Sequence, residues 1–177
     1  MTLDNEKMDT VVNNFTDMSN YARTMIDDVV NKITSNLDTI IEKINSDIIV
    51  IEAPVNIVEN YYLELVHELY FVAQATENLG LNDSLSKIYY KNTYNNCYLE
   101  PSIDKAKPTV AELTASAEND SLYEMTLNDI YNKAYKICKA KVDCAQTMVS
   151  SLSKVISRRI AESQLGVTSS SKNYLAE

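Results

Sequence analysis

The chain has 177 residues, a formal net charge of −9, and only two glycines and three prolines. This length suits one domain, or a small domain with a helical arm, and the scarcity of turn-forming residues favours long helices. No apolar run is long enough for a transmembrane helix, and the acidic start MTLDNEKMDT lacks the apolar core of a signal peptide. We therefore expect an intracellular, cytoplasmic protein.

The first predicted element is a long helix from about Asp9 to Glu52. Its apolar residues recur mostly at spacings of three and four, which is the helical period. Such a length indicates a coiled-coil-like arm or one helix of a long hairpin. Pro54 is expected to end it, because proline lacks an amide donor. The apolar positions are Val12, Phe15, Ala22, Ile26, Val29, Ile33, Leu37, Ile40, Ile44, Ile48 and Ile51.

Two further helices are predicted before residue 100. The second runs from near Val55 to Leu79, and Gly80 is interpreted as its C-terminal cap. The third begins at about Asn82 to Ser84 and contains the tyrosine-rich segment SKIYYKNTYNNCYLE. The predicted inner face of the second helix consists of Val58, Tyr61, Leu65, Leu69, Val72, Thr76 and Leu79.

The segment KAKPTVAELTASAEND joins this part to the last long helix. Thr109 and Glu112 have the spacing of a capping box, so we predict a short helix at about 110–118, ended by the following polar residues. The last helix is predicted from about Leu122 to Gln164, closed by Gly166 and followed by a disordered tail. It has a heptad seam of Tyr131, Tyr135, Cys138, Val142, Ala145, Val149, Leu152 and Ile156.

These elements predict an all-α protein of long helices in hairpin, bundle or coiled-coil-like packing. A short capped helix lies between the third and the last long helix. The expected division is an acidic N-terminal helix at residues 1–53, a helical core at 54–165 and a disordered tail at 166–177.

The side chains that usually carry chemistry are sparse. Two glycines cannot build a phosphate-binding loop, and the single histidine, His67, cannot complete a two-motif metal site with Glu64. Cys97, Cys138 and Cys144 are an odd set without zinc spacing, so we interpret them as buried small residues. We expect no enzyme activity, no catalytic residue, no metal and no cofactor.

Charge is distributed unevenly along the chain. Residues 1–80 have 14 acids and 4 bases, whereas the stretch from Lys133 to Arg159 has seven bases and one acid. Its bases recur at helical spacings, so they could follow a phosphate backbone or form a solvated face. Tyr89, Tyr90 and Tyr94 could stack on exposed nucleic-acid bases, or pack between helices.

From about Ser86 to Glu162 the pattern resembles the phage recombination-mediator family typified by UvsY. The similarity lies in the tyrosine-rich helix, the capped connector and the long basic helix that ends with Ile156-Ser157-Arg158-Arg159. The resemblance implies a homo-oligomer that binds single-stranded DNA, loosens a single-strand-binding protein and helps to load a RecA-like recombinase. It also implies that the heptad seam is the oligomerisation surface. The implied DNA contacts are Lys105, Lys107, Lys136, Lys139, Arg158 and Arg159, to which the basic stretch adds Lys133 and Lys154.

Two functional hypotheses follow. The first is a non-catalytic, single-stranded DNA-binding mediator with no membrane partner, located in the host cytoplasm if it is phage-encoded. The second is a helical structural or protein-interaction component, such as a virion or assembly protein, that does not bind nucleic acid. In the second case the basic faces would pair with acidic protein surfaces.

Overall fold

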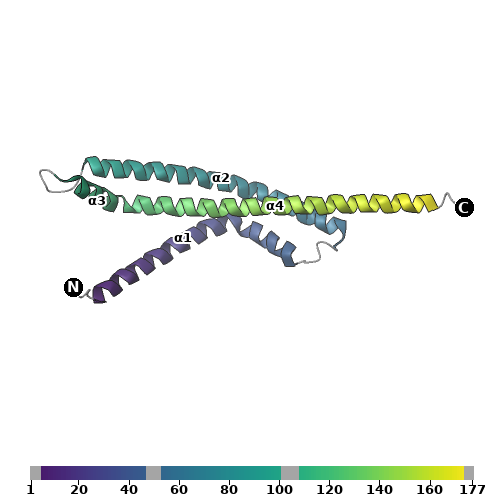
Figure 1. The fold of residues 1–177 in the computed structure, drawn as a ribbon, viewed down its shortest axis with the longest axis horizontal. Helices are drawn as coiled ribbons and strands as arrows, with labels where there is room; N and C mark the ends of the chain where they lie inside the picture. Colours follow the sequence, from purple (N-terminus) through teal and green to yellow (C-terminus); the bar gives the residue numbers. More distant parts are fainter. Residues whose placement is uncertain (1–4, 47–52, 101–107, 174–177) are drawn as a thin grey trace. The chain divides into compact units, whose positions relative to one another are not determined.

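The computed structural model describes residues 5–46, 53–100 and 108–173. Over these residues the chain forms four helices and no strand, which confirms the all-α prediction (Figure 1). The helices are α1 (Asn5–Ser46), α2 (Val55–Leu99), α3 (Val110–Asp120) and α4 (Leu122–Asn173). None of these helices has a stretch long and apolar enough to cross a membrane.

The contacts divide the chain into two compact units. Unit 1 combines Met1–Ile33 with Ala75–Cys138, and unit 2 combines Thr34–Gln74 with Lys139–Glu177. Each unit takes one segment from α1, one from α2 and one from α4, and unit 1 also contains α3. The division expected at residues 53 and 165 follows chain segments, whereas these units combine segments that are distant in sequence.

α1 confirms the long N-terminal helix, although it begins at Asn5 rather than at Asp9. Its predicted end at Glu52 lies outside the described residues, as do Ile48 and Ile51. The apolar stripe is buried at Leu37, Ile40 and Ile44. Further along the helix towards its N-terminus, the buried positions are Val30 and Thr34, while Val29 and Ile33 are half-buried. The burial of Thr34 could not be read from a stripe of apolar residues.

α2 is one continuous helix, so the predicted break at Gly80 is wrong. Gly80 does not have the positive φ of a helix-capping glycine. A Cβ atom added to it would lie 2.8 Å from Cε2 of Tyr135 in α4. Both residues belong to unit 1. The glycine therefore allows the tyrosine ring to approach the α2 backbone, and its cost within the helix is only about 1 kcal/mol.

Replacing Gly80 with alanine is expected to destabilise the protein, because the contact with the Tyr135 ring outweighs the gain in helix propensity. In a Tyr135→Leu background the ring is absent, and the same change should stabilise the protein by up to about 1 kcal/mol. Urea unfolding of the two single variants and the double variant measures both effects. The same sign of effect in both backgrounds would contradict the close-approach role of Gly80.

The buried face of α2 agrees with the sequence prediction. Val58, Leu65, Val72 and Leu79 recur every seven residues, and each is at most 4% exposed. Thr76 is also buried, Tyr61 and Leu69 are half-buried, and Ser86 continues the seven-residue spacing beyond Gly80. A heptad spacing is typical of helices that pack side by side along their length.

The core of unit 1 lies where α1, α2 and α4 meet. Val30, Leu79, Ala134 and Cys138 form a buried cluster, and half-buried apolar side chains pack around it. Next to this core, α2 and α4 are joined by hydrogen bonds from two amide side chains. Asn128 donates to Ser86 Oγ at 3.0 Å and to the carbonyl of Asp83 at 3.2 Å. Asn132 donates to the Asp83 carboxylate at 3.2 Å.

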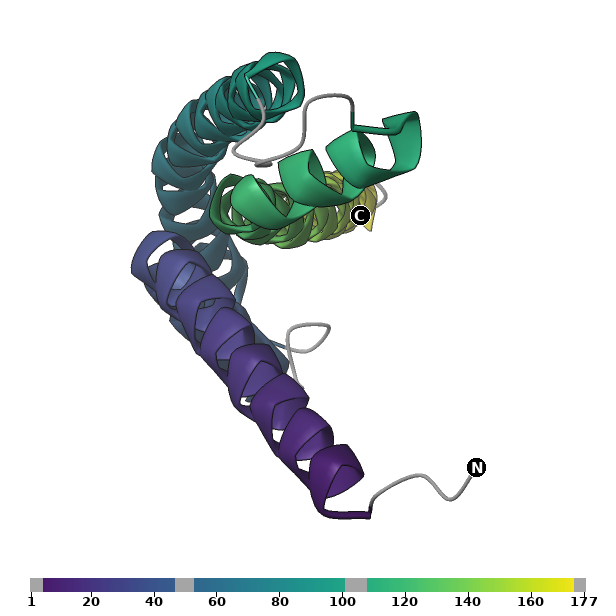
Figure 2. The same ribbon diagram turned by 90° about the vertical axis from the view of Figure 1, so that its left-hand side faces the viewer.

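α3 confirms the capping box. The Thr109 amide donates to Glu112 Oε2 at 2.9 Å, and the Glu112 amide donates to the Thr109 hydroxyl at 3.3 Å. The helix ends at Asp120, close to the predicted end, and Figure 2 shows it beside the start of α4. Ser121, fully buried at the junction, donates its hydroxyl to the carbonyl of Ala117 at 2.6 Å. The Ser121 amide donates to the same carbonyl at 3.1 Å, so one residue supplies two hydrogen bonds at the end of α3.

α4 begins at Leu122 as predicted, but it continues to Asn173. The prediction that Gly166 closes the helix is therefore wrong. Residues 167–173, which were assigned to a disordered tail, are helical, and 174–177 lie outside the described residues. A single glycine lowers helix propensity by only about 1 kcal/mol, and no proline follows it.

Unit 2 has its own buried side chains on all three helical segments. They include Leu37 and Ile40 of α1, Leu65 of α2, and Ala145 and Leu152 of α4. At the edge of this core Lys141 of α4 forms an ion pair with Asp38 of α1. Thr34 donates to the same carboxylate at 3.0 Å and accepts from Lys141 at 3.0 Å. Lys141 therefore joins α4 to α1 instead of facing solvent with the other bases.

Candidate nucleic-acid interface

Most of the exposed bases described in unit 2 lie on α4. Lys139, Lys154 and Arg158 are exposed, and Arg159 is half-buried. Arg158 Nε donates to Glu162 Oε1 at 2.8 Å, one helical turn further along. Both side chains of this pair are more than half exposed, so the pair contributes at most about 1 kcal/mol. Arg158 could therefore exchange its carboxylate partner for a phosphate at little cost.

Charge in unit 2 is segregated by helix. Between residues 139 and 165, α4 has five bases and two acids. The segments of α1 and α2 in the same unit have five acids and one base, Lys43. Lys43 lies 3.5 Å from Glu64, so this lone base of the α1 and α2 segments is close to an acid. Unit 2 thus presents a basic helix beside two acidic segments.

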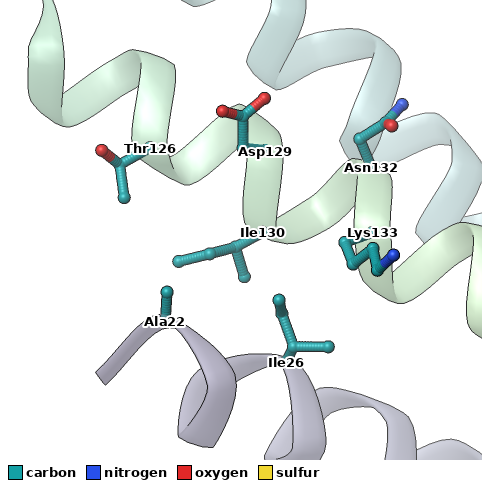
Figure 3. Close-up of a pocket in the computed structure, with 7 residues that line it drawn as sticks. All are labelled: Ala22, Ile26, Thr126, Asp129, Ile130, Asn132 and Lys133. Atoms are coloured by element: carbon teal, nitrogen blue, oxygen red, sulfur yellow. The ribbon is translucent and has the colours of Figure 1, made fainter. Parts of the chain in front are cut away.

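The bases of unit 1 have a different environment. Lys133 and Lys136 are exposed on α4. Lys133 borders an open depression of about 430 Å³, in which Ala22 and Ile26 of α1 point toward Ile130 of α4 (Figure 3). Asp129 lines this depression, and Asp27 lines a neighbouring one together with Lys133 and Arg23. These acids reduce the attraction of Lys133 for a polyanion.

The tyrosine-rich part of α2 lies in unit 1. The rings of Tyr90, Tyr94 and Tyr98 follow one another at centroid distances of 6.3 and 6.4 Å. All three are half-buried, so the structure favours helix packing over base stacking for Tyr90 and Tyr94. Tyr89 is 58% exposed and is the tyrosine of the predicted trio that remains accessible.

The heptad seam of α4 lies inside the chain. Cys138, Val142, Ala145 and Leu152 are at most 7% exposed. The remaining members, Tyr131, Tyr135, Val149 and Ile156, are half-buried. A second copy could not contact the buried side chains unless the chain opened. The buried members of the seam therefore contribute to the fold of the single chain.

Lys105 and Lys107, which the resemblance implied as DNA contacts, lie outside the described residues. The basic candidates that the structure places are therefore on α4. The structure separates these bases into two groups. Lys133 and Lys136 lie in unit 1, and unit 2 contains Lys139, Lys154, Arg158 and Arg159. Sequence spacing alone had joined them into one set.

The remaining chemical candidates are used in other ways. Glu64 contacts Lys43, and the exposed His67 ring lies edge-on to Phe71 at 5.0 Å. Over the described residues, no three His, Cys, Asp or Glu side chains gather as a metal site would require. Cys138 is buried and Cys97 half-buried, but Cys144 is exposed, which corrects the expectation that all three are buried.

No protein-family model matches the chain, and neither the curated proteins nor the solved structures gave a match.

Proposed function

We propose that this chain is a non-catalytic protein that binds single-stranded DNA through the basic part of α4 in unit 2. The observation that supports the proposal is the segregation of charge in that unit, where five bases of α4 lie beside acidic segments of α1 and α2. Lys139 and Lys154 are about 22 Å apart along the helix axis, since each residue adds about 1.5 Å. A surface of this length suits an extended phosphate backbone better than a single small anion.

Such binding would depend on backbone charge and would tolerate different base sequences. Bases that neutralise phosphates release counterions, so the affinity falls as the salt concentration rises. The acidic segments of the same unit would repel DNA and limit the contact to one helix. In this proposal, Tyr89 of unit 1 has no required part.

The resemblance to the UvsY-like mediators supports a more specific role. A mediator holds single-stranded DNA, loosens a single-strand-binding protein and helps to load a RecA-like recombinase, without hydrolysing ATP itself. A purely helical chain with a basic helix suits this binding role. In this proposal it acts in the cytoplasm, which is that of the host cell if the protein is phage-encoded.

Changing Lys154 and Arg158 to glutamine is expected to weaken binding to a fluorescein-labelled 30-nucleotide oligothymidine at least tenfold at low salt. The wild-type affinity should fall with salt, with a logarithmic slope of about −3 for four phosphate contacts, and the variant slope should be shallower. Fluorescence anisotropy across a salt series measures both quantities.

The matched control changes Arg23 and Lys32 of α1 to glutamine, which removes the same charge from exposed positions in unit 1. We expect less than a threefold change in affinity for this control. Equal weakening by both pairs would show that only net charge matters, and the proposed surface would be wrong. Absence of wild-type binding at low salt would contradict the whole proposal.

The second candidate function is a helical structural or protein-interaction component, for example of a virion. The exposed apolar side chains of α2, described below, favour it, because contiguous apolar patches on a protein surface often mark sites of contact with another protein. An oligomer that leaves DNA mobility unchanged in a gel-shift experiment would support this function and exclude the first.

A further inference from the structure

α2 has a second apolar stripe on the side opposite its buried face. In unit 1 this stripe consists of Leu81, Leu85 and Ile88, which are 59%, 54% and 56% exposed. Their spacing of four and three residues places them on one face of the helix. The buried residues of the same segment lie on the other side of the helix: Thr76, Leu79 and Ser86. A surface helix normally has only one apolar face, which packs against the core. A second apolar face exposed to solvent therefore suggests contact with another protein surface.

Charged residues flank the stripe in a self-complementary order. Glu77 and Lys91 are both exposed and lie fourteen residues apart, which is two heptads, on the same flank. Ser84, also exposed, lies midway between them. A two-fold axis near Ser84 would reverse the second helix, so that Glu77 of each copy would lie beside Lys91 of the other. The same axis would bring Leu81 of one copy close to Ile88 of the other, and the two Leu85 side chains would lie near the axis.

We propose that the α2 stripe of unit 1 is a homodimer interface, in which α2 packs antiparallel against α2 of a second copy. A second copy fits better than an unrelated partner. Under two-fold symmetry the apolar residues of one copy face those of the other, and the acid of one copy faces the base of the other. In an antiparallel pair the same flank of each helix faces its counterpart, so Glu77 meets Lys91 twice. In a parallel pair this flank would instead face the opposite flank of the other helix, so Glu77 and Lys91 would not meet.

This interface replaces the α4 seam as the self-association surface. The seam is buried in the single chain, whereas Leu81, Leu85 and Ile88 are accessible without any opening of the fold. The inference does not depend on DNA binding, because the stripe is in unit 1 and the proposed DNA contacts are in unit 2. Tyr89, which borders the stripe and is exposed, would be partly covered in the dimer.

The test measures the mass of the full chain by analytical ultracentrifugation over a range of concentrations. The wild type should form a dimer with twice the 20.0 kDa mass of one chain. Leu85→Glu should raise the dimer dissociation constant at least a hundredfold, because it places two carboxylates near the two-fold axis. Circular dichroism should show unchanged helicity, because Leu85 is exposed in the single chain.

A charge exchange tests the orientation. Glu77→Lys and Lys91→Glu should each weaken the dimer roughly tenfold, because each single change creates two repulsive pairs. The double variant E77K/K91E should restore dimerisation to within about threefold of the wild type. A monomeric wild type would overturn the proposal, as would a Leu85→Glu dimer of unchanged affinity. A double variant no stronger than the single variants would overturn the antiparallel register.

Discussion

Replacing Leu65 with alanine is expected to lower the free energy of unfolding by about 2–5 kcal/mol. Leu65 is on the buried face of α2 in unit 2 and is 0% exposed. Truncation removes apolar contacts and leaves a cavity that rigid neighbouring helices can close only in part. Urea unfolding followed by circular dichroism at 222 nm measures the loss.

Leu63 provides the matched control for this experiment. It lies two residues away on the same helix and is 62% exposed. Leu63→Ala removes the same atoms, so it should change the free energy of unfolding by less than about 0.5 kcal/mol. If the two variants lost the same stability, the assignment of the buried face of α2 would be wrong.

Enlarging Ala134 to leucine is expected to destabilise the protein by about 1–3 kcal/mol. Ala134 is 0% exposed in the unit 1 cluster with Val30, Leu79 and Cys138. Its small side chain allows α4 to lie close to the other helices, and extra methylene groups would force neighbouring side chains from their preferred rotamers. Thermal and urea unfolding would both register the change.

The control for this variant is Ala140→Leu, six residues further along α4 and exposed. Leucine and alanine are both good helix formers, so this change should be nearly neutral. If Ala134→Leu unfolded with the same free energy as the wild type, there would have to be unfilled space beside α4, and the close packing inferred for the buried cluster would be wrong.

Much of the helical organisation could be predicted because it depends on local signals. The heptad from Val58 to Leu79 indicated the buried face of α2, and the Thr109–Glu112 spacing indicated the cap of α3. Both are properties of residues only a few positions apart. The same local reasoning failed at Gly80 and Gly166, because a glycine can end a helix or allow close packing. For Gly80, the deciding atom belongs to Tyr135, which is distant in sequence.

The candidate site was harder to predict, because the role of a base depends on residues that lie far away along the chain. Lys141 belongs to the basic stretch in sequence, but Asp38 engages it from another helix. The seam of α4 was correctly interpreted as apolar and packed. Its partner could not be predicted, because a heptad shows only that a face is buried. The same pattern suits a neighbouring segment of the same chain or another copy.

The amide groups of Asn128 and Asn132 have a consequence for how the helices of unit 1 are aligned. A slip of α4 by one heptad would still bring apolar residues against α2, since the spacing repeats. Such a slip would, however, move both amides about 10 Å along the axis from Asp83 and Ser86, leaving half-buried polar groups without partners. These hydrogen bonds therefore select one axial register among several that the apolar repeat would tolerate, and their contribution is to the uniqueness of the fold more than to its stability.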